Sequence, residues 1–255
     1  AYHNIDEIYS YLQNMSYLYS GSAQVITGGK SFEGRPILGL RINTQSSKKK
    51  PVIFIESGIH AREWIAPATT TYFINQLLTS NDRSIMGLRD NFDWHIFPSV
   101  NPDGYQYSWT HDRFWRKTRS KSPTSKCIGT DPNRNWDYNW EVGCSDDPCD
   151  PELYRGAKPF SEIETKTLSE YISSLQNLRG YISFHSFSKV LLLPFSDSSD
   201  MDWVRHAFKT PLVFTYELRG NNFLWPKERI PEQGEEVTQM ILGMATAARK
   251  MGYFN

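Results

Sequence analysis

The first residues of the chain show the hydrophobic period of a helix. Asn4 and Glu7 stand at the N-cap and third positions of a capping box, where each side chain accepts a hydrogen bond from the other residue's backbone. The pattern predicts an amphipathic helix whose apolar face is formed by Ile5, Ile8, Tyr9 and Leu12. Further helices are expected from Pro67 onward and over residues 162–174 and 235–251.

Three short runs of the chain are apolar almost throughout instead of alternating. They cover residues 52–55, 180–184 and 212–218, and this character is typical of strands buried on both faces of a parallel sheet. Other strands are expected near 24–27, 37–42 and 94–100, the last followed by a turn over 101–104. Strands that alternate with helices predict one α/β domain with a central, largely parallel sheet covered on both faces.

Two of the apolar runs end in residues that can bind a metal. His60 and Glu63 follow the run 52–55, and His185 follows the run 180–184. Because ligands gather at the carboxyl ends of strands in open α/β sheets, we expect these side chains to lie together. Two imidazoles and a carboxylate suit zinc, whose catalytic sites have three protein ligands and an open position. The alternatives are a solvated surface pair for His60 and Glu63, and a hydrogen-bonded core histidine for His185.

The third apolar run contains a carboxylate, Glu217. Burying this charge without a partner would be costly. One interpretation is a structural ion pair with the nearby Arg219 or with another arginine. The other is a general base beside the metal, which takes a proton from water and delivers it to a leaving amine.

Two arginine-bearing segments, 114–119 and 131–136, indicate what such a site would attack. Nucleic-acid binding is disfavoured, because 28 basic residues are balanced by 28 acidic ones. A guanidinium group binds a carboxylate through two parallel hydrogen bonds. The segments therefore predict a zinc hydrolase that recognises the free C-terminus of a peptide. A membrane span is not expected, because the sequence has no apolar run of about eighteen residues.

These segments, in this order, resemble the zinc metallocarboxypeptidases of the pancreatic carboxypeptidase A and B family. The likeness runs from Tyr2-His3 to Glu217-Leu218-Arg219 and includes the segments 31–36, 101–105 and 185–188. It implies the mature catalytic domain of such an enzyme over residues 1–255, built on a mixed eight-stranded sheet with helices on both faces. It also implies a secreted, extracellular, monomeric enzyme that is made as a zymogen and acts on peptide or protein C-termini. Its expected protein partners are an inhibitory pro-segment and a proteinaceous inhibitor.

The resemblance assigns a role to each candidate residue. One zinc ion would be held by His60, Glu63 and His185, and Asp131 would orient the His60 imidazole. Glu217 would be the general base. The residues matched to substrate contacts are Arg119 for the scissile carbonyl, Asn133 and Arg134 for the terminal carboxylate, and Arg62 and Phe187 for the binding groove, with Phe187 where the family usually has tyrosine.

Specificity depends on Met201, which matches the base of the family's side-chain pocket. An apolar residue there predicts a preference for apolar or aromatic C-terminal residues. Its neighbour Asp200 lies beside a gap, and a shift of one position would predict a preference for Lys or Arg instead. The family has some tens of residues that this chain lacks, between about 196 and 198. We interpret them as omitted from the sequence, because a real deletion would leave a large apolar surface exposed.

The chain has three cysteines. The resemblance pairs Cys127 with Cys149, which implies an oxidising compartment and leaves Cys144 over. A pairing of Cys144 with Cys149 stays open. Two other functions also stay open, a zinc-dependent deacylase of small amides and a non-catalytic binding protein on the same fold.

Overall fold

The computed structural model describes residues 1–44, 49–122, 124–194 and 199–254. Its centre is a sheet of seven strands in the order β1-β2-β4-β3-β5-β7-β6. The strands are β1 (Ala23–Lys30), β2 (Pro36–Ile42), β3 (Val52–Ser57), β4 (Asp93–Phe97), β5 (Leu178–Ser186), β6 (Val190–Leu192) and β7 (Leu212–Leu218). The expected eight strands are thus corrected to seven in the described residues. The short strand β6 forms one edge of the sheet, and the expected gap at about 196–198 lies outside the described residues.

The four central strands of the sheet run parallel, as the uninterrupted apolar runs predict. β3 pairs in parallel with β4 and β5, and β5 pairs in parallel with β7. The outer pairs β1–β2, β2–β4 and β6–β7 are antiparallel. The carboxyl ends of β3, β5 and β7 therefore meet at one edge of the sheet.

Most of the expected helices form close to their predicted bounds. The helices are α1 (Ile5–Leu18), α2 (Ile65–Thr79), α3 (Arg83–Asn91), α4 (Pro102–Thr110), α5 (Ile163–Ser174), α6 (Asp200–Phe208) and α7 (Ile230–Lys250), with 3-10 helices η1 (Pro132–Arg134) and η2 (Lys227–Arg229). The capping box of Asn4 and Glu7 is present at the start of α1. The expected turn over 101–104 is wrong, because Asn101 caps helix α4 by accepting from the Gly104 amide.

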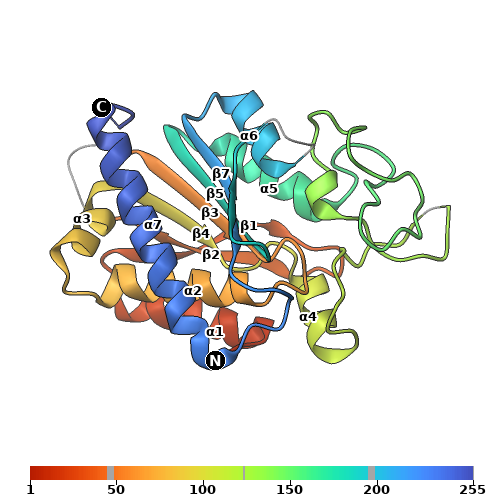
Figure 1. Ribbon diagram of the computed structural model, residues 1–255, viewed down its shortest axis with the longest axis horizontal. Coiled ribbons are helices and arrows are strands. Elements are labelled where there is room, and N and C mark those ends of the chain that lie inside the picture. The colour runs from red at the N-terminus through yellow and green to blue at the C-terminus, as the bar shows by residue number, and fades with distance from the viewer. Residues whose placement is uncertain (45–48, 123, 195–198, 255) are drawn as a thin grey trace.

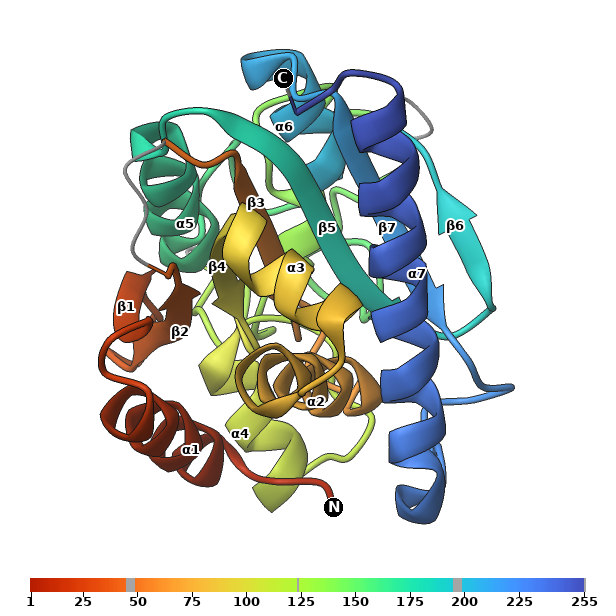
Figure 2. The same ribbon diagram turned by 90° about the vertical axis from the view of Figure 1, so that its left-hand side faces the viewer.

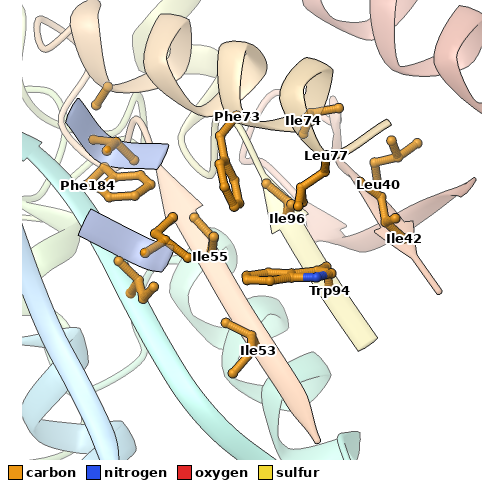
Figure 3. Close-up of a cluster of buried hydrophobic side chains, with 14 of the residues drawn as sticks. Leu40, Ile42, Ile53, Ile55, Phe73, Ile74, Leu77, Trp94, Ile96 and Phe184 are labelled. Carbon is orange, nitrogen blue, oxygen red and sulfur yellow. The ribbon is translucent and has the colours of Figure 1, made fainter. Parts of the chain in front are cut away.

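Helices cover both faces of the sheet, as predicted. Figures 1 and 2 show α1, α2, α3 and α7 on one side of the strands and α5 and α6 on the other. The larger core lies on the first side, where Phe73, Ile74 and Leu77 of α2 point towards Trp94 and Ile96 of β4 (Figure 3). A second core joins α5 and α6 to the opposite face of the strands. This double cover explains why β3 is buried at every position.

One disulfide ties together the long connection between α4 and α5. Cys127 and Cys149 are bonded, as the resemblance implies, and Cys144 is a free, partly buried thiol. Among the described helices, none has the length and apolar character needed to cross a membrane.

Candidate active site

The predicted ligands converge at the carboxyl edge of the central strands. His60 and Glu63 lie in the turn between β3 and α2, and His185 is the penultimate residue of β5. Glu217 on β7 stands directly opposite His185 in the parallel register. All four side chains line one cavity of about 400 Å³. Sheet topology thus brings together residues that are far apart in the sequence.

A single glycine makes the turn that delivers His60 and Glu63. Gly58 directly follows β3 and has a positive φ of 67°. A Cβ atom at this position would lie 3.2 Å from the Pro98 carbonyl oxygen and 3.2 Å from the Ser99 Cα atom. The turn therefore needs a residue that tolerates both the left-handed backbone and the close approach of a neighbouring chain segment.

The donor atoms of three buried side chains face one another. The His60 Nδ1 atom lies 2.9 Å from Glu63 Oε1 and 3.1 Å from His185 Nδ1. The His185 Nδ1 atom is 3.3 Å from Glu63 Oε2. Two imidazole nitrogens and a carboxylate that converge in this way form a donor set suited to zinc. Burial alone would raise the pKa of Glu63, but His60 and His185 hold it well below its usual range, so its carboxylate is ionised.

Asp131, held by an arginine, contacts the side of the His60 ring that faces away from Glu63 and His185. The His60 Nε2 atom lies 3.1 Å from Asp131 Oδ1, and the second carboxylate oxygen accepts a hydrogen bond of 2.8 Å from Arg116. Burial alone would raise the pKa of Asp131, yet Arg116 and His60 hold it well below its usual range. An ionised Asp131 favours the tautomer with the proton on Nε2, which leaves Nδ1 free to bind a metal.

Arg116, and not Arg119, is the arginine beside this cluster. Arg116 lines the cavity, and its Nη1 atom lies 3.3 Å from His60 Nδ1 and 4.0 Å from Glu63 Oε1. Arg119 lies outside the cavity, with its guanidinium 3.6 Å from the ring centre of Tyr107. The expected position of Arg119 is therefore corrected. The described residues of the connection that carries both arginines form no helix or strand, so its sequence has no period from which side-chain direction could be predicted.

Glu217 faces the same cavity from the neighbouring strand. Burial raises the pKa of this carboxyl group above its ordinary value, and the charge of His185 opposes the shift. The alternative interpretation, an ion pair with Arg219, does not hold, because the Arg219 guanidinium contacts Glu232 and Glu236.

The residues matched to the substrate carboxylate line the same cavity. Asn133 and Arg134 belong to η1, directly after Asp131, and both line the cavity. The Arg134 Nη1 atom donates to the Asn133 carbonyl oxygen at 2.9 Å. Arg62 binds both carboxylate oxygens of Glu152 and stacks over Phe223, which itself lines the cavity.

Met201 and Asp200 take different positions, since Met201 lines the cavity and Asp200 does not. Met201 lines it, 2% exposed, with its sulfur atom 3.4 Å from Thr215 Oγ1. Asp200 is fully buried behind it, where it accepts hydrogen bonds from the Tyr181 hydroxyl at 2.8 Å and from the Met201 amide at 2.7 Å. Phe187 forms part of the rim and packs edge-on against Phe223.

A buried acid beneath the site had no assigned role in the sequence. Glu56 on β3 is fully buried and accepts a hydrogen bond from Ser183 on β5. Burial raises the pKa of Glu56 well above its ordinary value. Donor atoms of Glu56, His185 and Asp200 lie within 4.8 Å of one another. The signal that could have found Glu56 is a carboxylate directly after an apolar run, which resembles the carboxylate inside an apolar run that singled out Glu217.

Comparisons with known proteins agree with this geometry. A family model described as zinc carboxypeptidase matches residues 8–201. A zinc carboxypeptidase of Simulium vittatum is 39% identical over an alignment of 303 positions that covers 100% of this chain and 99% of the relative. The chain belongs to the zinc carboxypeptidase family. The alignment is longer than the 255 residues of this chain, so the relative has positions without a counterpart here.

Both subtypes of the zinc carboxypeptidase family are among the relatives. A carboxypeptidase B of Astacus astacus is 42% identical and aligns with 80% of this chain and 68% of its own length. The structure of bovine thrombin-activatable fibrinolysis inhibitor in complex with tick carboxypeptidase inhibitor superimposes with a TM-score of 0.90, at 28% identity, over 98% of each chain. Zinc carboxypeptidases are peptide hydrolases, which sets aside a non-catalytic protein.

Proposed function

We propose that this zinc carboxypeptidase releases one residue at a time from the free C-termini of peptides and proteins, with a preference for apolar or aromatic residues. The observation that carries the proposal is the shared cavity of His60, Glu63, His185 and Glu217. Arg116, Asn133 and Arg134 line the same cavity, which gives it cationic and amide groups for a terminal carboxylate and for a developing oxyanion. A deacylase of small amides would not need these groups for a terminal carboxylate.

The convergent donors fit a single zinc ion held by His60, Glu63 and His185. Zinc bound there would supply Lewis-acid chemistry, by acidifying water and polarising a carbonyl group. Asp131 holds the His60 ring in the orientation that keeps its Nδ1 atom directed at Glu63 and His185.

The protein side chains perform the remaining steps. Asn133 and Arg134 bind the terminal carboxylate of the peptide, which places the last peptide bond beside Glu217. Glu217 takes a proton from the attacking water and returns it to the leaving amine. Arg116 donates hydrogen bonds to the scissile carbonyl oxygen as negative charge develops on it. The raised pKa of Glu217 makes its carboxylate a better base for the proton of the attacking water.

The preference for apolar residues rests on the contrast between Met201 and Asp200. Met201 faces the cavity, whereas both oxygens of Asp200 are already hydrogen-bonded behind it. A C-terminal Lys or Arg would therefore meet the Met201 sulfur and the Thr215 hydroxyl and no free carboxylate. This arrangement supports an A-type preference over the B-type alternative.

The proposal extends to the setting of the enzyme. The disulfide between Cys127 and Cys149 is typical of secreted proteins, and we propose a secreted, monomeric enzyme made as a zymogen with an inhibitory pro-segment. The likeness to a structure solved with tick carboxypeptidase inhibitor supports a proteinaceous inhibitor as a partner.

Replacement of Glu217 by Gln tests the mechanism. The variant should bind zinc as the wild type does, because His60, Glu63 and His185 are untouched, while kcat falls by about two to four orders of magnitude. Zinc content and kcat on a peptide ending in Phe are the two measurements. A kcat close to that of the wild type would remove Glu217 from the role of base.

A further inference from the structure

Arg119 is held on an aromatic platform outside the active-site cavity. Its guanidinium carbon lies 3.6 Å from the ring centre of Tyr107 and 4.4 Å from that of Trp115. The far side of Tyr107 stacks on His111, with ring centres 4.7 Å apart, and the Trp115 indole donates a hydrogen bond of 2.7 Å to the Lys117 carbonyl oxygen. The platform is fixed by its own contacts, so the guanidinium is already in place before any ligand arrives.

The hydrogen-bonding capacity of Arg119 is unused within the described part of the chain. Its guanidinium makes ring contacts there but no hydrogen bond and no ion pair. The neighbouring arginines differ, since Arg62 binds Glu152, Arg113 binds two carbonyl oxygens and Arg116 binds Asp131. Arg119 therefore offers a planar fork of donors that matches a carboxylate.

The platform borders a hollow of about 360 Å³. Its apolar wall includes Trp115, Ile128 and Phe114, whose side chain is 52% exposed. Arg116 lines both this hollow and the active-site cavity, so the two are adjacent. We expect a polypeptide whose C-terminus occupies the active site to reach the hollow with an upstream residue.

The acidic residues of the hollow do not compete for Arg119. Asp112 accepts a hydrogen bond from the Phe114 backbone amide, and both carboxylate oxygens of Glu152 bind Arg62. Arg119 therefore has no carboxylate partner among the described residues of the hollow.

We propose that this hollow is a distal substrate subsite, in which Arg119 binds the carboxylate of an Asp or Glu upstream of the bond that is cut. The proposal rests on the proposed function. The aliphatic part of the acidic residue lies against Phe114 and Trp115, and the carboxylate takes the open edge of the guanidinium. Arg119 is thus a specificity residue for acidic polypeptides and takes no part in the chemical step.

The test uses peptides with identical C-terminal residues and one upstream position that carries either Asp or Asn. The position is moved along the peptide one residue at a time. We expect Asp to lower KM about three- to tenfold relative to Asn at one or two adjacent positions, with equal kcat, and high salt to reduce the difference. In Arg119→Gln the two peptides should have equal KM at every position. Arg83→Gln, a change at an exposed arginine on α3, should keep the difference.

A binding measurement separates failure of this proposal from failure of the proposed function. The same peptides, with a fluorescent label, are titrated by anisotropy against zinc-loaded Glu217→Gln protein with and without Arg119→Gln. If no peptide is cut by the wild type, the proposed function fails, but tighter binding of Asp peptides that requires Arg119 would still support the subsite. Equal binding of Asp and Asn peptides at every position, or a preference that persists in Arg119→Gln, would overturn it.

A more conservative variant keeps the test decisive if Arg119→Gln does not fold. Arg119→Lys retains the positive charge but lacks the planar fork. It should lose at least half of the difference between Asp and Asn peptides. An undiminished difference in Arg119→Lys would contradict the paired hydrogen bonds that the proposal requires.

Discussion

At the scale of residues, Arg116 and Arg119 have identical side chains but different surroundings, because the chain directs them to different sides. Arg116 turns inward to Asp131 and the metal-binding cluster, where it is 12% exposed. Arg119 turns outward onto Tyr107 and Trp115. Both stand in one basic and aromatic segment. The resemblance matched Arg119 to the scissile carbonyl, whereas Arg116 is the one of the two that lines the active-site cavity, and we propose the role for Arg116.

Arg116→Gln should lower kcat by about two to three orders of magnitude, because the oxyanion loses a charged donor. The loss in Arg119→Gln should be far smaller on a dipeptide too short to reach the hollow. Steady-state kinetics of both variants make the comparison, and zinc content shows whether the loss of the Asp131 contact has weakened the metal site. A larger fall in kcat for Arg119→Gln would reverse our assignment of the two arginines.

At the scale of elements, the strand ends and the turns after them build the site. β5 and β7 place His185 and Glu217 opposite each other through backbone pairing alone. The other two predicted ligands, His60 and Glu63, depend on the turn at Gly58. The left-handed backbone of Gly58 redirects the chain from β3 towards α2. The metal site is therefore sensitive to a residue that contacts no ligand.

Gly58→Ala should destabilise the fold by about 1 to 3 kcal/mol, because it combines a strained φ with a crowded Cβ atom. It should also weaken zinc binding by displacing His60 and Glu63. Urea unfolding of the zinc-free protein and a zinc titration measure the two effects. Gly243→Ala in α7 is the matched control, since no atom lies within 4 Å of its added Cβ atom, and it should not destabilise. Equal stability of the two variants would contradict the account of the turn.

The elements that could be predicted from the sequence are those with a strong local signal. The apolar runs at β3, β5 and β7 and the capping box of α1 are of this kind, and their parallel pairing was enough to expect His60, Glu63 and His185 at one edge. Helix α6 was not expected, although Ser199 and Asp202 form a capping box, because the helix has only 9 residues and directly follows the expected gap. The position of Arg116 could not be predicted, because the connection 112–131 that carries it has no helical or strand periodicity in its sequence. The position of Arg116 depends on tertiary contacts such as the ion pair between Arg116 and Asp131.

At the scale of the whole molecule, a buried acid makes the stability of the fold depend on pH. Glu164, in the first turn of α5, is 2% exposed and accepts a hydrogen bond of 2.8 Å from the Phe32 amide. Its second oxygen has no hydrogen-bond partner in the described structure. Burial raises the pKa of Glu164 to about 8 from its ordinary value of 4.5.

The raised pKa of Glu164 predicts a loss of stability with rising pH. The folded protein keeps this proton up to about pH 8, whereas the unfolded chain releases it near pH 4.5. The contribution is complete below pH 4.5 and is lost as the pH rises to about 8, at no more than about 1.4 kcal/mol per pH unit. Glu164→Gln, which cannot ionise, should lack this part of the pH dependence in urea unfolding. Identical profiles for wild type and variant would contradict a buried, protonated Glu164.

The central claim, zinc-dependent removal of C-terminal residues, is tested most directly by amino-acid release from matched peptides. The peptides end in Phe, Leu, Lys or Arg, each with a free or an amidated C-terminus, and each is incubated with zinc or with a chelator. Our account predicts release of Phe and Leu from the free peptides alone, and its loss on amidation and on chelation. Release of Lys and Arg instead would overturn the role of Met201. Release from amidated peptides, or undiminished release with the chelator, would contradict the zinc carboxypeptidase mechanism itself.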